Sequence, residues 1–134
     1  MKIVFADTFY FLALYYPDDQ YHAQTVRLIR QLKARFLTTD WVLTEVADAL
    51  SAGRDHQNVA PLIRRLWESP VWEIIPFSRD QFDAALEFHS RHQDKEWTLT
   101  DCASFLIMQE RGITEVLTGD RHFEQAGFTA LLNK

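Results

Sequence analysis

Short apolar runs that alternate with helical segments constrain the fold of this chain more than any other feature of its sequence. The runs are typical of buried parallel strands, and the segments between them carry the apolar spacing or the capping residues of helices. Such alternation predicts an α/β domain with a mainly parallel central sheet. The predicted strands cover residues 2–6, 36–38, 71–77, 115–118 and 128–131, and the predicted helices cover residues 8–15, 18–35, 40–50, 59–68, 78–92 and 98–111, with a helical turn at 122–124.

Acidic residues stand where these strands give way to helices. Asp7 ends the apolar run 3–6, Asp120 follows residues 116–119, and Asp101 opens the last long helix. Ligand sites in open parallel sheets lie outside the carboxyl ends of the strands, so these carboxylates are expected to meet at one edge. Carboxylates gathered in this way bind hard cations, and such a cation can activate water against a phosphodiester. The pattern therefore favours a metal-dependent nuclease.

Glu45 lies on a helix face that is expected to be apolar. Val42, Val46 and Ala49 mark this face, and Glu45 shares it by its spacing from the first and the last of them. A buried carboxylate is costly unless it is paired or binds a metal, so Glu45 joins the candidate site. The alternative for Glu45 is a surface position on a rotated helix. The alternative for the three aspartates is helix capping, a common role of Asp at the start of a helix.

Two hydroxyl residues stand beside the acids. Thr8 follows Asp7, and Thr118 comes two residues before Asp120. We expect their hydroxyls to hold a water or to orient a carboxylate, with simple helix capping as the alternative. The basic residues nearest to a substrate phosphate would be Arg121 and His122, which follow the last acid.

Composition limits the other classes of protein. The chain has 134 residues, 47% of them hydrophobic, which fits one domain over residues 1–134. Cys102 is the single cysteine, so neither an internal disulfide nor a thiolate metal site can form. The N-terminus does not resemble a signal peptide, and no run approaches the roughly 20 apolar residues of a membrane span, so we expect a cytoplasmic protein. The net charge of -5 implies that any nucleic-acid contact depends on local basic patches.

Four segments together resemble the PIN-domain family, particularly the VapC-type toxins of toxin–antitoxin pairs. They occur in the order and at separations like those of the family, and the resemblance extends over nearly the whole chain. The segments are residues 4–8 (VFADT), 44–50 (TEVADAL), 99–105 (LTDCASF) and 117–123 (LTGDRHF).

The resemblance implies a three-layer α/β/α sandwich around the predicted sheet. The family's acidic quartet corresponds to Asp7, Glu45, Asp101 and Asp120, which would hold one or two Mg²⁺ or Mn²⁺ ions and cleave RNA endonucleolytically. It also implies a homodimer and, for a toxin, a small antitoxin that binds the region of residues 8–35. This region is rich in large apolar side chains, and part of it is expected to remain exposed as a contact patch.

Some positions depart from the expected patterns. Gly119 stands before the last acid, where the family commonly has a polar residue, and we expect it to loosen Asp120. A phosphohydrolase with Asp7 as the nucleophile would need a second Asp two residues later, where Phe9 stands. The remaining alternatives to a toxin are a housekeeping RNA-processing PIN nuclease and a catalytically inactive RNA-binding PIN domain.

Overall fold

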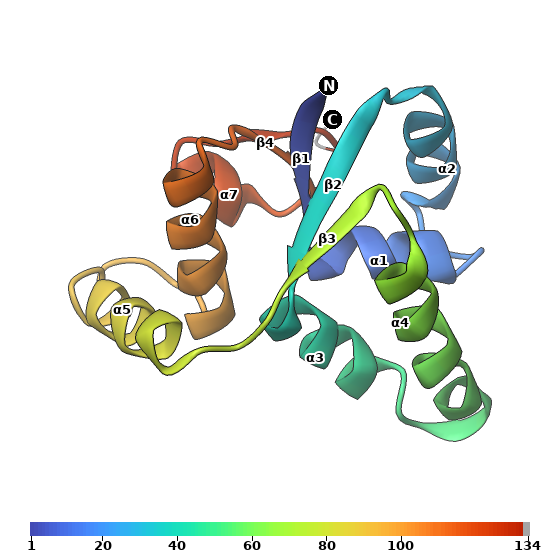
Figure 1. Cartoon of the computed structure of the whole chain (residues 1–134), viewed down its shortest axis with the longest axis horizontal. Coiled ribbons are helices and arrows are strands. Elements are labelled where there is room, and N and C mark those ends of the chain that lie inside the picture. Colours follow the sequence, from blue (N-terminus) through green and yellow to red (C-terminus); the bar gives the residue numbers. More distant parts are fainter. Residues whose placement is uncertain (133–134) are drawn as a thin grey trace.

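A five-stranded, all-parallel sheet forms the centre of the computed structural model, which describes residues 1–132 (Figure 1). The strand order within these residues is β3-β2-β1-β4-β5. The last two residues of the predicted domain, 133–134, lie outside the described part. The strands are β1 (Lys2–Ala6), β2 (Ala34–Thr39), β3 (Trp72–Ile75), β4 (Glu115–Leu117) and β5 (Thr129–Ala130).

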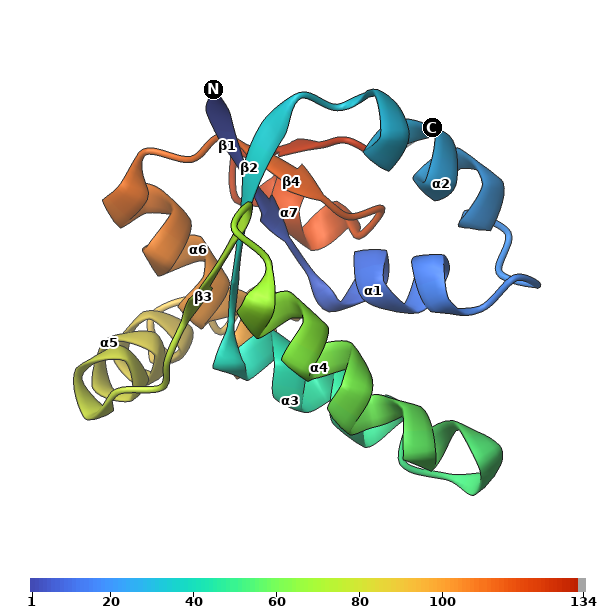
Figure 2. The same cartoon turned by 45° about the vertical axis from the view of Figure 1, so that its right-hand side comes forward.

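Helices cover both faces of the sheet, as expected for a three-layer sandwich (Figures 1 and 2). Helices α1, α2 and α4 lie on one side of the strands, and α5, α6 and α7 lie on the other. Their bounds are α1 (Thr8–Tyr15), α2 (His22–Gln31), α3 (Asp40–Ala49), α4 (Val59–Glu68), α5 (Arg79–Ser90), α6 (Leu99–Arg111) and α7 (Arg121–Gln125), with a 3₁₀ helix η1 (Gly53–Asn58) before α4. No helix among the described residues has the length and apolar character to cross a bilayer.

The direction in which the chain winds reverses at β1. This strand pairs with β2 on one side and with β4 on the other, and Phe5 and Ala6 stand opposite Val116 and Leu117. In open α/β sheets, the crevice at such a switch point lies outside the carboxyl ends of the two strands. The residues that follow β1 and β4 are therefore placed side by side.

The core next to this switch point is built from large aromatic rings. Phe5 of β1, Phe105 of α6 and Phe123 of α7 are fully buried, and Phe105 contacts Phe123 edge to face at 5.0 Å between ring centroids. Trp97 packs edge to face on Phe105 at the same centroid distance. This packing fixes α6 and α7 against the strands and so fixes the side chains at the helix starts.

Two predictions about helices were wrong in detail. The second helix spans His22–Gln31 rather than residues 18–35, because residues 18–21 lie in turns and a bend and because Ala34 and the following residues pair with β1 as strand β2. On α3, Ala49 is exposed while Leu50 is fully buried. The helix is thus rotated relative to the predicted face, and Glu45 is half-buried at the border of that face.

Gly119 is required by a close contact rather than by its backbone conformation. Its φ is not positive, unlike that of the glycines at positions 53, 112 and 127. A Cβ atom at Gly119 would lie 2.5 Å from Cζ of Phe9, far inside van der Waals contact. The Phe9 ring is itself held edge to face on Tyr21 at 4.9 Å between centroids. The Phe9 ring thus occupies the space that a side chain at position 119 would fill. This contact restrains the backbone at Gly119, contrary to the expectation that this glycine loosens the position of Asp120.

A test of this contact is the pair Gly119→Ala and Phe9→Ala. Gly119→Ala alone is expected to lower the free energy of unfolding by about 1–3 kcal/mol, because the added methyl group overpacks the site. In the Phe9→Ala background the same change should cost much less, since the space is then free. Urea unfolding of the four proteins of this double-mutant cycle measures the coupling. Additive losses would contradict the contact.

Candidate metal centre

Asp7 is the most deeply placed of the predicted acids. It follows β1 directly and is buried, and the hydroxyl of Thr118 donates a hydrogen bond of 3.0 Å to its Oδ2. The pKa of the Asp7 carboxyl is raised to about 7, mainly by burial and also by the negative charges of Asp101 and Asp120, while the hydrogen bonds from Thr118 and from the backbone of Thr8 act in the opposite direction. Asp7 therefore lies within the electrostatic reach of two other predicted acids.

Asp101 both caps its helix and points inward. Its backbone N–H donates to Oγ1 of Thr98, and the backbone N–H of Thr98 donates to its Oδ2, which completes a capping box at the start of α6. The same Oδ2 atom lies 2.9 Å from Nδ1 of His122. The side chain is buried, on a helix face shared with Phe105 and Met108. From the sequence, helix capping is an alternative to a role in the site. In the structure, Asp101 caps α6 and also lies beside His122.

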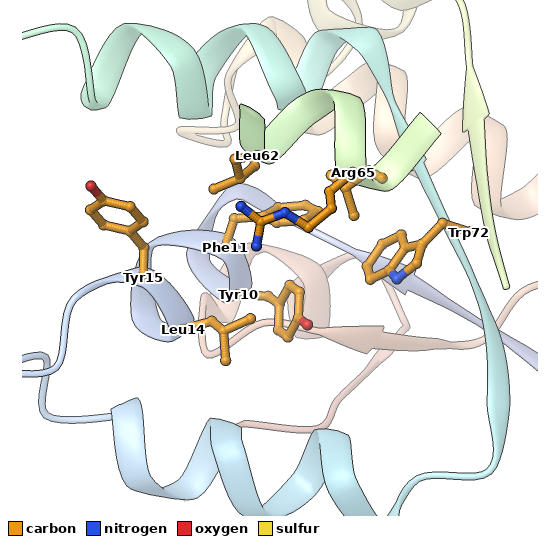
Figure 3. Close-up of a pocket in the computed structure, with 8 residues that line it drawn as sticks. Tyr10, Phe11, Leu14, Tyr15, Leu62, Arg65 and Trp72 are labelled. Atoms are coloured by element: carbon orange, nitrogen blue, oxygen red, sulfur yellow. The ribbon is translucent and has the colours of Figure 1, made fainter. Parts of the chain in front are cut away.

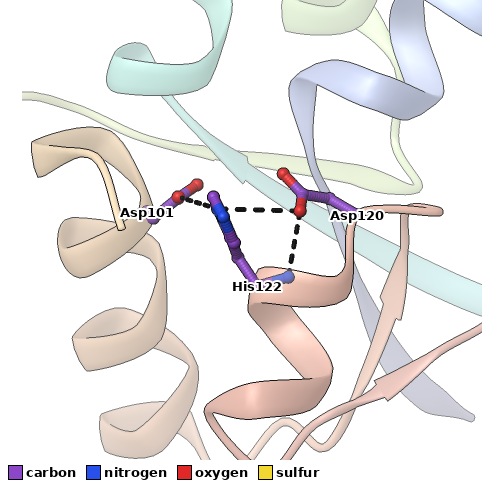
Figure 4. Close-up of side chains that lie close together, drawn as sticks. All are labelled: Asp101, Asp120 and His122. Atoms are coloured by element: carbon purple, nitrogen blue, oxygen red, sulfur yellow. Dashed lines mark hydrogen bonds and ion pairs between the residues drawn. The ribbon is translucent and has the colours of Figure 1, made fainter. Parts of the chain in front are cut away.

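Asp120 stands at the start of α7 with the same double arrangement. Its Oδ1 accepts a hydrogen bond of 2.9 Å from the backbone N–H of His122, and it lies 3.6 Å from Nδ1 of the same residue. Asp101, Asp120 and His122 each offer a ligand atom, and these atoms lie within 4.8 Å of one another. Figure 4 shows the imidazole ring between the two carboxylates. Sequence reasoning had treated His122 only as a substrate contact, because its distance from Asp101 depends on the tertiary fold.

Glu45 is connected to the segment around Asp7 through the hydroxyl of Thr8. The side chain of Thr8 donates a hydrogen bond of 2.7 Å to Oε1 of Glu45. Thr8 follows Asp7 in the chain, so the bond ties α3 to the end of β1. The ligand group of Asp101, Asp120 and His122 does not include Glu45 or Asp7. The structure thus couples Asp7 electrostatically to Asp101 and Asp120, and it connects Glu45 to Thr8, the residue that follows Asp7.

The donor set fits a divalent cation. Carboxylate oxygens are the ligands that Mg²⁺ and Mn²⁺ accept readily, and a neutral imidazole can join them for Mn²⁺. Burial is the main cause of the raised pKa of Asp7, and the charges of Asp101 and Asp120 add to the rise, so the metal-free acids oppose one another's ionisation. A cation held by Asp7, Asp101 and Asp120 would remove that opposition, because its charge favours ionised carboxylates.

Comparison with known proteins gives matches over almost the whole chain. The family model described as the PIN domain matches residues 4–129. The 23S rRNA-specific endonuclease VapC20 of Mycobacterium tuberculosis is 30% identical over 127 residues, which are 94% of this chain and 95% of the relative.

Solved structures agree with this assignment. The crystal structure of Mycobacterium tuberculosis VapC20, described as a sarcin–ricin loop cleaving toxin, superposes with a TM-score of 0.86 at 26% identity and covers 96% of this chain and 98% of that one. FitAcB from Neisseria gonorrhoeae, at 18% identity and a TM-score of 0.67, covers 95% of both chains and supports the fold alone. The chain therefore belongs to the PIN-domain family of nucleases, and its relatives include the VapC-type toxin ribonucleases.

Proposed function

We propose that the protein is a Mg²⁺-dependent endoribonuclease that acts as the toxin of a toxin–antitoxin pair in the cytoplasm. The observation that carries the proposal is the cluster of Asp101, Asp120 and His122, whose ligand atoms lie within 4.8 Å of one another, together with Asp7, whose pKa is raised by burial and by the charges of Asp101 and Asp120. The substrate class is RNA. The sarcin–ricin loop, which the VapC20 relative cleaves, is the first substrate to test.

The residues of the chain have separable roles in this proposal. When bound, a divalent cation supplies Lewis acidity toward the phosphodiester and makes an attacking water more acidic. Asp7 and Asp101 hold the cation, and Thr118 keeps the Asp7 carboxylate in place through its hydrogen bond. Glu45, oriented by the hydroxyl of Thr8, holds a water beside the acids. Asp120 is fixed by the α7 backbone and completes the negative surface that attracts the cation.

The alternatives have less support. A phosphohydrolase that uses Asp7 as its nucleophile would need a second acid where Phe9 stands, and the Phe9 ring is packed against Gly119. A catalytically inactive domain is disfavoured because all four acids of the family's quartet are present. A housekeeping nuclease would have the same metal centre as a toxin. It would differ from a toxin in having no antitoxin.

A groove between α1 and α4 supports a protein partner of the antitoxin kind. It has a volume of about 440 Å³, and Figure 3 shows side chains of the two helices facing each other across it. The large apolar residues of the 8–35 region are buried or half-buried rather than exposed as a flat patch, and four of them, on α1, line this groove. We propose that an apolar segment of a small antitoxin lies in it. The lining residues are Tyr10, Phe11, Leu14, Tyr15, Leu62, Arg65, Leu66 and Trp72.

Exposed apolar side chains concentrate elsewhere, on α4, α5 and the segment before α5. Trp67 and Phe77 are 61% and 53% exposed and line one hollow, and Phe82 and Leu86 continue the surface along α5. The ring of Trp41 joins Phe77 to Phe82, with centroid distances of 5.5 Å to each. We propose that this surface, rather than residues 8–35, is covered by a second copy in a homodimer.

The proposed activity is tested by Asp101→Asn. The wild-type protein should cleave RNA with Mg²⁺ and lose this activity in EDTA. The cleavage rate of the variant should be at least a hundredfold lower. The variant should remain folded, because Asn keeps the capping box but removes the charge. RNA cleavage assays and thermal melts of both proteins check this. An active variant would remove Asp101 from the mechanism, and an unfolded one would leave it only a capping role.

The pKa of Asp7 predicts a dependence of stability on pH in EDTA. The folded protein holds the Asp7 proton up to about pH 7 and the unfolded chain releases it near 3.8, so folding stability falls as pH rises between these values. The loss is roughly 4 kcal/mol at most. Asp7→Asn should therefore be more stable than wild type at pH 7.5 and similar to it at pH 4. Urea unfolding at both pH values measures this, and an equal difference at both would refute it.

Two substitutions on α4 distinguish the proposed role of the groove, antitoxin binding, from that of the exposed apolar surface, dimerisation. Leu62→Glu places a charge in the groove and should weaken binding of the proposed antitoxin, sought as a small protein encoded beside this chain, at least tenfold, while RNA cleavage persists. Trp67→Ser is the control: it should leave that binding unchanged and turn a dimer into a monomer in light scattering. If Leu62→Glu leaves that binding unchanged, the groove is not the partner site. If expression of the chain alone does not slow growth, the toxin assignment fails and a housekeeping nuclease remains.

A further inference from the structure

A polar hollow of about 300 Å³ lies beside the candidate metal centre. It is formed by the loop before α6 and by α7. It shares His122 with the acidic cluster, and Nδ1 of this residue is 2.9 Å from Oδ2 of Asp101. A group bound in the hollow would therefore sit next to a phosphodiester held at the metal centre. The lining residues are Asp94, Lys95, Glu96, Arg121, His122 and Gln125.

The two walls of this hollow are fastened together. The indole N–H of Trp97 donates a hydrogen bond of 3.0 Å to Oε1 of Gln125, which joins the loop to α7. Trp97 is buried and packs edge to face on Phe105. The backbone N–H of Lys95 donates to the carbonyl of His92 and closes a turn at the rim. The hollow is thus a built feature whose shape does not depend on exposed side chains alone.

Two cations face the hollow. Arg121 is exposed and follows Asp120 directly, and no ion pair among residues 1–132 includes it. Lys95 has its Nζ 3.0 Å from a carboxylate oxygen of Asp94 and 5.9 Å from the ring centroid of Trp97. The carboxylates of Asp94 and Glu96 also line the hollow, so Arg121 is the cation most free to take an anion.

An RNA strand that reaches the acidic cluster needs such cations. The cluster repels every phosphate except one bound through a cation, and the neighbouring phosphates of the strand lie close to it. Helix α2, which carries Arg27 and Arg30, lies on the opposite side of the sheet from α6 and α7 (Figure 1). Arg121 and Lys95 are the cations that line the hollow beside the centre.

We propose that this hollow binds the RNA phosphate next to the scissile one, with Arg121 as the main contact and Lys95 as the second. The inference rests on the proposed ribonuclease function. Guanidinium groups suit this task because they present paired N–H donors to phosphate oxygens. Arg121 is then a positioning residue: it places the strand so that the adjacent phosphodiester meets the acids.

The test measures RNA binding without cleavage. Asp101→Asn serves as the background, and a fluorescent RNA hairpin is titrated in Mg²⁺ at several salt concentrations. Adding Arg121→Ala should weaken binding about tenfold and reduce the slope of log affinity against log salt by about one, as expected for one lost phosphate contact. Lys95→Ala should have a smaller effect, and Arg121→Lys should restore part of the affinity and the full salt slope.

Arg30→Ala is the matched control, since it removes the same charge from an exposed position of α2, a helix on the other side of the sheet. It should change the affinity less than twofold. Equal weakening by Arg30→Ala and Arg121→Ala, or an unchanged salt slope in Arg121→Ala, would overturn the phosphate site alone. Failure of the background protein to bind RNA at all would instead overturn the proposed function.

Discussion

One buried hydrogen bond, from the hydroxyl of Thr118 to the carboxylate of Asp7, joins residues 111 positions apart in the chain. It can form only because β1 and β4 are neighbours in the sheet, and this pairing also defines the switch point. A carboxylate buried at this position is costly to ionise, and a hydroxyl offsets only part of that cost. The position therefore favours a cation, and the other acids of the centre are arranged around it.

Helix starts supply the rest of the centre. Asp101 and Asp120 each accept a backbone N–H at the beginning of a helix, and each keeps an oxygen near His122. The capping bonds hold the carboxylates in one orientation, and the positive end of the helix dipole favours their charge. Capping thus contributes to a site of this kind, because it lowers the cost of holding several acids close together before a cation binds.

The surfaces of the molecule are divided by the sheet. The apolar groove between α1 and α4 lies on one side, while the loop before α6 and helix α7 form the polar hollow on the other. The acidic cluster lies at the strand ends between them. An RNA strand and a protein partner can thus approach from different sides, and a partner in the groove would have to extend to the strand ends to affect the acids.

The sequence by itself determined the alternation of strands and helices, the acids at the strand ends and the family to which the chain belongs. These follow from local patterns: apolar runs, capping residues and the spacing of four short segments. The tertiary structure alone decided where α2 yields to β2, since strand pairing overrides the helical pattern near Arg35. It also decided that Leu50 rather than Ala49 faces the core, that His122 joins Asp101, and that Phe9 fills the space above Gly119. Each of these depends on contacts between residues far apart in the chain, and local sequence patterns carry no information about such contacts.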